Sequence, residues 1–132
     1  MGMGKAKSKQ QIYGKDKVLN VQVHGDSAVC AQGIILEALC LSKTPNFDVN
    51  GSIHIITNNQ LGYTTRPIDS RPSKYATDVF KAYDIPILHV NGENIEDIHR
   101  AVRLAVEYRN KYKKDFMIDI ICYRKYGHNE VD

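Results

Sequence analysis

Residues 18–42 read VLNVQVHGDSAVCAQGIILEALCLS, and this stretch decides the fold class. Its first part, residues 18–24, alternates apolar and polar side chains and ends at Gly25, which is typical of a β-strand. Residues 27–42 then place Ala, Ile and Leu side chains at helical spacing, and Pro45 ends any helix. The stretch therefore predicts a strand that passes directly into a helix.

The same alternation of strand and helix continues along the chain. Short β-branched or apolar runs predict strands at residues 52–57, 85–90 and 116–123, and helical spacing predicts helices at 75–83 and 95–113, with a long loop at 58–74 between them. Strands that are apolar nearly throughout are typical of a parallel sheet that is covered on both faces. We therefore expect an α/β fold, a doubly wound and mostly parallel sheet with helices on both faces.

Composition excludes several classes of protein. The chain has 132 residues, of which 42% are apolar and 25% charged, so it suits one domain with one core. A net charge of +3 is too small for a nucleic-acid surface, although it is compatible with anionic ligands. No apolar run is long enough to span a membrane. The three cysteines form no CxxC pair, which favours reduced thiols in an intracellular compartment.

The first residues are rich in lysine. Five lysines lie within the first seventeen positions, and we expect residues 1–16 to form a solvated, frayed basic tail ahead of an α/β domain at 17–132. This tail has no apolar run, so it is not a signal peptide, and it has no arginine, so it is a poor mitochondrial presequence.

Polar residues follow the predicted strands. Ligands of open α/β sheets bind beyond the carboxyl ends of the strands, and those ends are expected along one edge. Gly25 is expected to let the backbone turn tightly there. The first amides of the next helix, from Ser27 and Ala28, would then form an anion site that suits a phosphate. Asp26 would repel that phosphate unless a hard cation lay between them.

Magnesium is the cation that this arrangement favours. Mg²⁺ takes oxygen ligands in an octahedral array, some of them from phosphate. Asp26, the side-chain oxygen of Asn59 and the carbonyl of Leu61 would complete the shell with two phosphate oxygens and a water. Alone, a Gly-Asp pair before a helix is more often a cap, and an Asn-Asn pair is more often a turn. Together, at the ends of two successive strands, they indicate a site.

The order of these residues resembles a known cofactor motif. Gly25-Asp26-Ser27 and Asn58-Asn59, with 30 residues between Ser27 and Asn58, are similar to the Gly-Asp-Gly and Asn-Asn of the thiamine diphosphate motif. Longer strings resemble the first, decarboxylating component of 2-oxoglutarate dehydrogenase, and equally its relative that acts on 2-oxoadipate: HGDSA at 24–28, AQGI at 31–34, NNQLGYTT at 58–65, CYR at 122–124 and GHNE at 127–130. The NNQLGYTT string argues against relatives that act on pyruvate or on branched 2-oxo acids.

The resemblance implies a thiamine diphosphate-binding fold and roles for matched positions. Asp26, Asn59 and the Leu61 carbonyl would hold Mg²⁺, and Gly25, Ser27 and Ala28 would lie against the cofactor diphosphate. His128 matches a loop histidine that touches the diphosphate and lines the path of a lipoyl arm, so we expect it to be catalytic and cofactor-binding. The remaining histidines are expected to be structural: His24, His54, His89 and His99.

The resemblance also implies an activity in the tricarboxylic acid cycle. The intact enzyme would be a mitochondrial homodimer, or cytoplasmic otherwise, that decarboxylates 2-oxoglutarate and passes the succinyl unit to the lipoyl group of an acyltransferase component. We expect this chain to be a fragment of that much longer enzyme and to be inactive by itself. The alternatives are an enzyme acting on 2-oxoadipate and a truncated, non-catalytic phosphate-binding module. Neither a nucleic acid nor a membrane is an expected partner.

Overall fold

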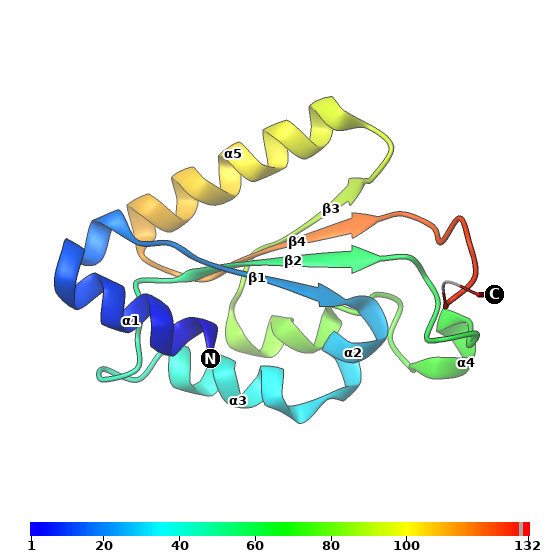
Figure 1. Cartoon of the computed structure of the whole chain (residues 1–132), viewed down its shortest axis with the longest axis horizontal. Coiled ribbons are helices and arrows are strands. Elements are labelled where there is room, and N and C mark those ends of the chain that lie inside the picture. Colours follow the sequence, from blue (N-terminus) through cyan, green and yellow to red (C-terminus); the bar gives the residue numbers. More distant parts are fainter. Residues whose placement is uncertain (130) are drawn as a thin grey trace.

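A computed structural model describes residues 1–129 and 131–132. The chain forms one sheet with helices on both faces (Figure 1). The strands are β1 (Asn20–Gly25), β2 (Ser52–Asn58), β3 (Ile87–Asn91) and β4 (Phe116–Ile121). The helices are α1 (Gly2–Tyr13), α2 (Asp26–Ala31), α3 (Gly33–Ser42), α4 (Pro67–Ser70) and α5 (Ile95–Tyr112), with 3-10 turns η1 (Lys15–Lys17) and η2 (Asp78–Tyr83). The predicted α/β class is confirmed.

The four strands are parallel and lie in the order β1-β2-β4-β3. Gly25 is the register partner of Thr57, and Asn58 is the register partner of Ile121. The carboxyl ends of the strands therefore lie along one edge, as the sequence predicts, and all four arrowheads point the same way in Figure 1.

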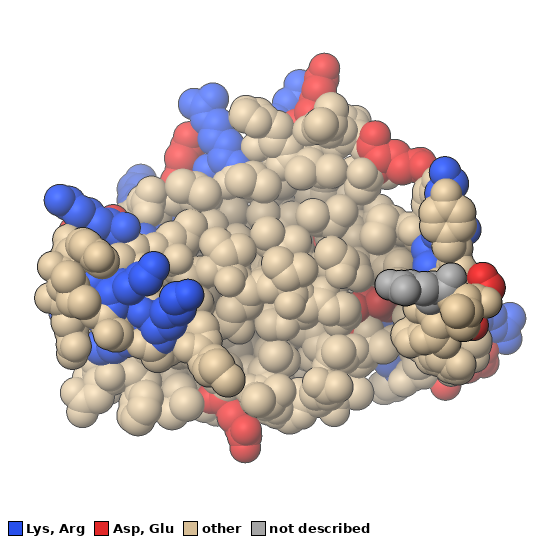
Figure 2. Space-filling model, viewed as in Figure 1, with Lys and Arg blue, Asp and Glu red and all other residues tan. Residues whose placement is uncertain are grey.

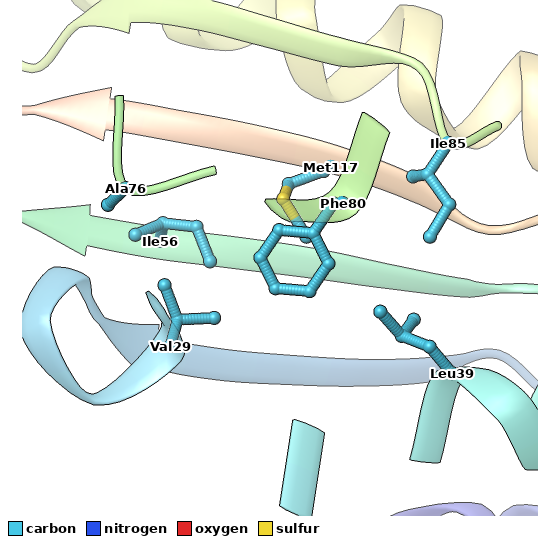
Figure 3. Close-up of a cluster of buried hydrophobic side chains, with 7 residues drawn as sticks. All are labelled: Val29, Leu39, Ile56, Ala76, Phe80, Ile85 and Met117. Atoms are coloured by element: carbon cyan, nitrogen blue, oxygen red, sulfur yellow. The ribbon is translucent and has the colours of Figure 1, made fainter. Parts of the chain in front are cut away.

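Each face of the sheet buries its own apolar cluster. The cluster under α2, α3 and η2 is shown in Figure 3 and consists of Val29, Leu39, Ile56, Ala76, Phe80, Ile85 and Met117. The cluster under α5 consists of Ile53, Val90, Ala101, Ala105, Phe116 and Ile118. Val29 is 1% exposed and packs with Ile56, so the short helix α2 is fixed to the sheet immediately after β1 ends.

The helix expected at residues 27–42 is interrupted. Gln32 adopts φ −90° and ψ 120°, an extended conformation that ends α2, and α3 starts at Gly33. Gln32 N still donates to Ala28 O, which closes the last turn of α2. Apolar spacing continues across this single extended residue, so the sequence pattern does not reveal the break.

The expectation of a frayed tail at residues 1–16 is wrong. Residues 2–13 form α1, which buries Ala6 and Gln10 against the body of the domain. Gln10 Nε2 donates to Val49 O at 2.8 Å, and Lys7 Nζ donates to Asp48 O at 2.8 Å. The contact is made through polar groups and one alanine, which is why hydrophobic patterning does not detect it.

The other expectations agree with the structure to within a few residues. Asn94 caps α5, where its side chain accepts from the amides of Glu96 and Asp97. The loop predicted at 58–74 contains one helical turn, α4. Figure 2 shows a group of basic side chains at the end of the molecule where the strands begin, and further basic side chains at the end where the strands finish. In the described part of the chain, every helix is too short or too polar to cross a membrane.

Candidate functional site

Asp26 is a buried carboxylate at the start of α2. The residue is 3% exposed, and its nearest charge is the guanidinium of Arg71, whose Nη1 lies 3.8 Å from Asp26 Oδ2. Burial raises the pKa of Asp26 above its ordinary value, although its own backbone amide and the charge of Arg71 oppose this shift. Asp26 Oδ2 has no hydrogen-bond partner. A buried oxygen without a donor is well suited to a cation.

The first turn of α2 carries the other predicted phosphate contacts. Ser27 is half-buried, its Oγ has no hydrogen-bond partner, and Ala28 is exposed. The helix has only 6 residues, so its dipole contributes less than that of a long helix. Its first amides still lack intrahelical partners, because every helix leaves its first N–H groups free.

The glycine that the local geometry requires is Gly62, not Gly25. Gly25 has φ −80° and ψ 150°, an ordinary extended conformation, and a Cβ there would meet no atom within 4 Å. The prediction of a tight turn at Gly25 is therefore wrong. A Cβ on Gly62 would lie 2.5 Å from Ser27 Oγ and 3.2 Å from Ser27 Cβ. Gly62 thus brings the loop after β2 directly against α2.

The two asparagines after β2 have different environments. Asn58 is 2% exposed and donates to Asp119 Oδ1 at 3.1 Å, while its own Oδ1 accepts from the Gln60 amide. Asn59 is less buried, and its Oδ1 accepts from the Leu61 amide at 3.1 Å. Asn58 therefore fixes the loop to the sheet. Asn59 and Leu61 lie in the following turn, joined by that hydrogen bond.

A chain of polar contacts supports Asn58 from across the sheet. Asp119, on the central strand β4, is fully buried and accepts from Asn58 through one oxygen. Its other oxygen lies 2.8 Å from Nδ1 of His89 on β3, and the His89 ring stacks on Tyr75 at 4.0 Å. The expectation that His89 is structural agrees with these contacts. Nε2 of His24 lies 3.2 Å from Nδ1 of His54, and Nε2 of His54 lies 3.6 Å from Oδ2 of Asp115.

The segment after β4 folds back onto the same loop. Gln60 Nε2 donates to Cys122 O, and Arg124 Nη1 donates to Tyr63 O at 2.6 Å. The exposed ring of His128 lies edge-on to Tyr63, with 4.6 Å between centroids. The structure thus places His128 against the loop that carries Asn59 and Leu61. Glu130, which forms part of the GHNE string, lies outside the described residues.

Arg71 is the site residue that the sequence analysis misses. Its side chain is 6% exposed and pairs with Asp26, yet it follows α4 in a polar segment rich in Pro and Ser. Nothing in that segment distinguishes Arg71 from Arg66, whose side chain is 72% exposed. Burial of a charged residue in a loop depends on the fold around it, so the sequence carries no local signal for it.

The donors fit a magnesium diphosphate better than a bare structural metal. The described residues contain no group of three or more His, Cys, Asp and Glu side chains that could hold a metal. The predicted set has one carboxylate, one amide oxygen and one carbonyl, so it needs ligand oxygens to complete a shell. Mg²⁺ commonly binds in this way, through one or two carboxylates plus substrate phosphates.

Known proteins resemble this chain along its whole length. The family described as "Dehydrogenase E1 component" matches residues 1–132. The chain is 50% identical over 133 residues to "2-oxoglutarate dehydrogenase, mitochondrial" of Dictyostelium discoideum, covering 98% of the chain and 13% of that protein. It is 48% identical over 132 residues to the "2-oxoglutarate dehydrogenase E1 component" of Rickettsia conorii, covering 98% of the chain and 14% of that protein.

A relative named for another substrate is equally similar. The "2-oxoadipate dehydrogenase complex component E1" of Rattus norvegicus is 52% identical over 117 residues, covering 89% of the chain and 13% of that protein. The chain thus spans only 13–14% of the length of these relatives. The resemblance noted in the sequence is confirmed, and the chain belongs to the dehydrogenase E1 component family.

Proposed function

We propose that this chain is the diphosphate- and magnesium-anchoring segment of a thiamine diphosphate-dependent 2-oxo acid dehydrogenase. The observation that carries the proposal is the unpartnered Oδ2 of the buried Asp26, at the edge of the sheet where ligands of this fold class bind. Family membership supports the cofactor assignment. Asp26, Asn59 and the Leu61 carbonyl would hold Mg²⁺, and the amides of Ser27 and Ala28 would bind the diphosphate.

In this proposal the chain positions the cofactor and leaves the bond-breaking chemistry to it. Thiamine diphosphate, when bound, accepts the electrons released as carbon dioxide leaves a 2-oxo acid. Gly62 permits the close approach between the loop after β2 and α2, and Asn58 fixes the start of that loop. His128, next to Tyr63, would lie near the diphosphate on the path by which a lipoyl group arrives.

The substrate is proposed to be 2-oxoglutarate, with the succinyl unit passed to a lipoyl-bearing acyltransferase component. The relative from Rickettsia conorii is named as an E1 component, which supports a partner of this kind. A 2-oxoadipate substrate is the second candidate, because the rat relative that carries that name is 52% identical. A homodimeric enzyme in the mitochondrion is part of the proposal, and the name of the Dictyostelium relative supports that location.

Substitution of the proposed ligands tests this function. In the full-length protein that carries this segment, Asp26→Ala should abolish Mg²⁺-dependent binding of thiamine diphosphate, and Asn59→Ala should weaken it. Asp69→Ala is the matched control, because Asp69 is a half-exposed aspartate paired with Arg66 on α4. Isothermal titration with and without Mg²⁺ gives the affinities. An Asp26→Ala protein that binds like wild type would refute the metal assignment, and equal affinity for inorganic diphosphate and cofactor would favour a phosphate-binding module.

A further inference from the structure

Unsatisfied polar atoms gather around Asp26. Eight buried side-chain nitrogen or oxygen atoms of the described residues have no hydrogen-bond partner, and four of them belong to Asp26, Ser27 and Arg71. These four are Asp26 Oδ2, Ser27 Oγ, and Nε and Nη1 of Arg71. Buried polar atoms are normally bonded, because an unbonded one has lost its hydrogen bonds to water without replacing them. Their concentration at one place indicates a site built for a polar ligand.

The pairing between Arg71 and Asp26 is incomplete. The distance of 3.8 Å from Nη1 to Oδ2 permits electrostatic attraction but is too long for a hydrogen bond. Both side chains are more than nine-tenths buried, so bulk solvent does not reach the unpaired atoms. The pair therefore balances charge without satisfying the guanidinium, whose Nε–H and Nη1–H groups remain without acceptors.

A guanidinium with two unbonded donors is suited to a phosphate. Its planar fork presents neighbouring N–H groups that match two oxygens of a phosphate or carboxylate. Among the described residues its ion-pair partner is Asp26, the proposed magnesium ligand, so a bound Mg²⁺ would draw charge away from the ion pair. A diphosphate oxygen next to that Mg²⁺ would then give Arg71 the acceptor that it lacks.

We propose that Arg71 is a diphosphate-binding residue of this site. In the ligand-free protein it is the counter-ion of Asp26, and in the loaded protein it donates to the diphosphate while Asp26 binds Mg²⁺. This inference rests on the proposed function, because it takes Asp26 as the metal ligand. It differs from a positioning role, in which Arg71 would only hold Asp26 in place for the metal.

Two binding measurements separate these roles. In the full-length protein, Arg71→Met should weaken binding of inorganic diphosphate at saturating Mg²⁺ by about 10- to 100-fold, the loss expected for charge-assisted hydrogen bonds. Binding of Mg²⁺ alone should be unchanged or tighter, because a positive charge that competes for Asp26 has been removed. Arg71→Lys should show a smaller loss for diphosphate, because an ammonium keeps the charge without the fork. Arg66→Met, an exposed arginine of the same segment, should bind both probes like wild type.

Each result decides between the roles. Wild-type diphosphate affinity in Arg71→Met overturns the proposal, and so does an equal loss of affinity for diphosphate and for Mg²⁺ alone, which would identify a positioning residue. If Arg71→Met does not fold, Arg71→Lys decides, and wild-type diphosphate affinity there overturns the proposal. Asp26→Ala, measured in parallel, isolates the proposed function: loss in Asp26→Ala with no change at Arg71 rejects only this inference, and no change in either rejects both.

Discussion

At the scale of one residue, Gly62 and Gly25 differ in the space that a side chain would have. A Cβ on Gly62 would approach Ser27 Oγ to 2.5 Å, whereas one on Gly25 would meet nothing within 4 Å. Gly62→Ala should therefore lower the free energy of unfolding by about 1–3 kcal/mol, the usual penalty of overpacking. Gly25→Ala, the matched control, should change it by less than about 0.5 kcal/mol.

Urea denaturation of both variants measures this difference. Adding Ser27→Ala to Gly62→Ala removes the oxygen that clashes and should restore part of the stability, since contacting residues are coupled. Equal stability of the two glycine variants would show that the loop after β2 does not press on α2.

The carboxyl group of Asp26 should make stability depend on pH. Burial raises the pKa of Asp26 in the folded protein, so the folded state binds its proton more tightly than the unfolded state. The stability contributed by the protonated form is complete below the ordinary pKa of 3.8 and is lost as pH rises through the raised, folded pKa. Relative to wild type without Mg²⁺, Asp26→Asn should gain stability with rising pH across that window.

Asp115 provides a control, because its pKa is shifted in the opposite direction to that of Asp26. Burial would raise its pKa, but His54 and the amide of Ser52 hold the pKa of Asp115 below its ordinary value. Its stabilisation is present above the ordinary pKa and is lost as pH falls through the lowered one. Asp115→Asn should thus lose stability relative to wild type as pH rises. Thermal melting at several pH values checks both, and slopes of the same sign would contradict the assignments.

Single residues were predictable where their chemistry follows from their place after a strand. Asp26 and Asn59 could be selected because parallel strands bring their carboxyl ends together, whatever the details of packing. Gly62 and Arg71 could not, because their importance lies in contacts with Ser27 and Asp26 that are distant in sequence. Gly25 was assigned a turn from its residue type alone, and its backbone angles contradict that assignment.

At the scale of elements, α1 offers the sharpest test. Gln10 is 5% exposed and donates to Val49 O, whereas its neighbour Gln11 is exposed. Gln10→Ala should lower the free energy of unfolding by about 1–3 kcal/mol, because it leaves a buried carbonyl without its donor. Gln11→Ala should have almost no effect. Chemical denaturation distinguishes them, and identical midpoints would mean that residues 2–13 do not pack on the domain in solution.

Strands were more predictable than helices in this chain. The four strands are short, and apolar or alternating runs mark them in the sequence, so their observed bounds differ from the expected ones by at most two residues. The sequence does not predict the break at Gln32, because one extended residue does not disturb helical spacing. The sequence does not predict the helix α1, because its buried face contains Ala6 and a polar Gln10 instead of large apolar side chains.

At the scale of the whole molecule, the chain by itself should not decarboxylate any 2-oxo acid. In the proposed function it supplies only an anchor for the diphosphate, while the resemblance implies that the cofactor ring and its activating glutamate are held elsewhere. Loss of fixed orientation can raise a barrier by about 7–11 kcal/mol. An assay of residues 1–132 with thiamine diphosphate, Mg²⁺, 2-oxoglutarate and an artificial electron acceptor measures this. Turnover near that of an intact enzyme would show that these residues form a complete catalyst.

The strand order has a consequence for how the protein is made. Of these four strands β4 is the last to be synthesised, yet it lies between β2 and β3. Among the described residues β3 pairs only with β4, so β3 has no strand to pair with until residues 116–121 have been synthesised. The β1-β2 pair can form earlier, since nascent chains fold from the amino terminus. Until β4 inserts, the nascent chain presents an open edge of β2, which is a point where chaperones would be expected to act.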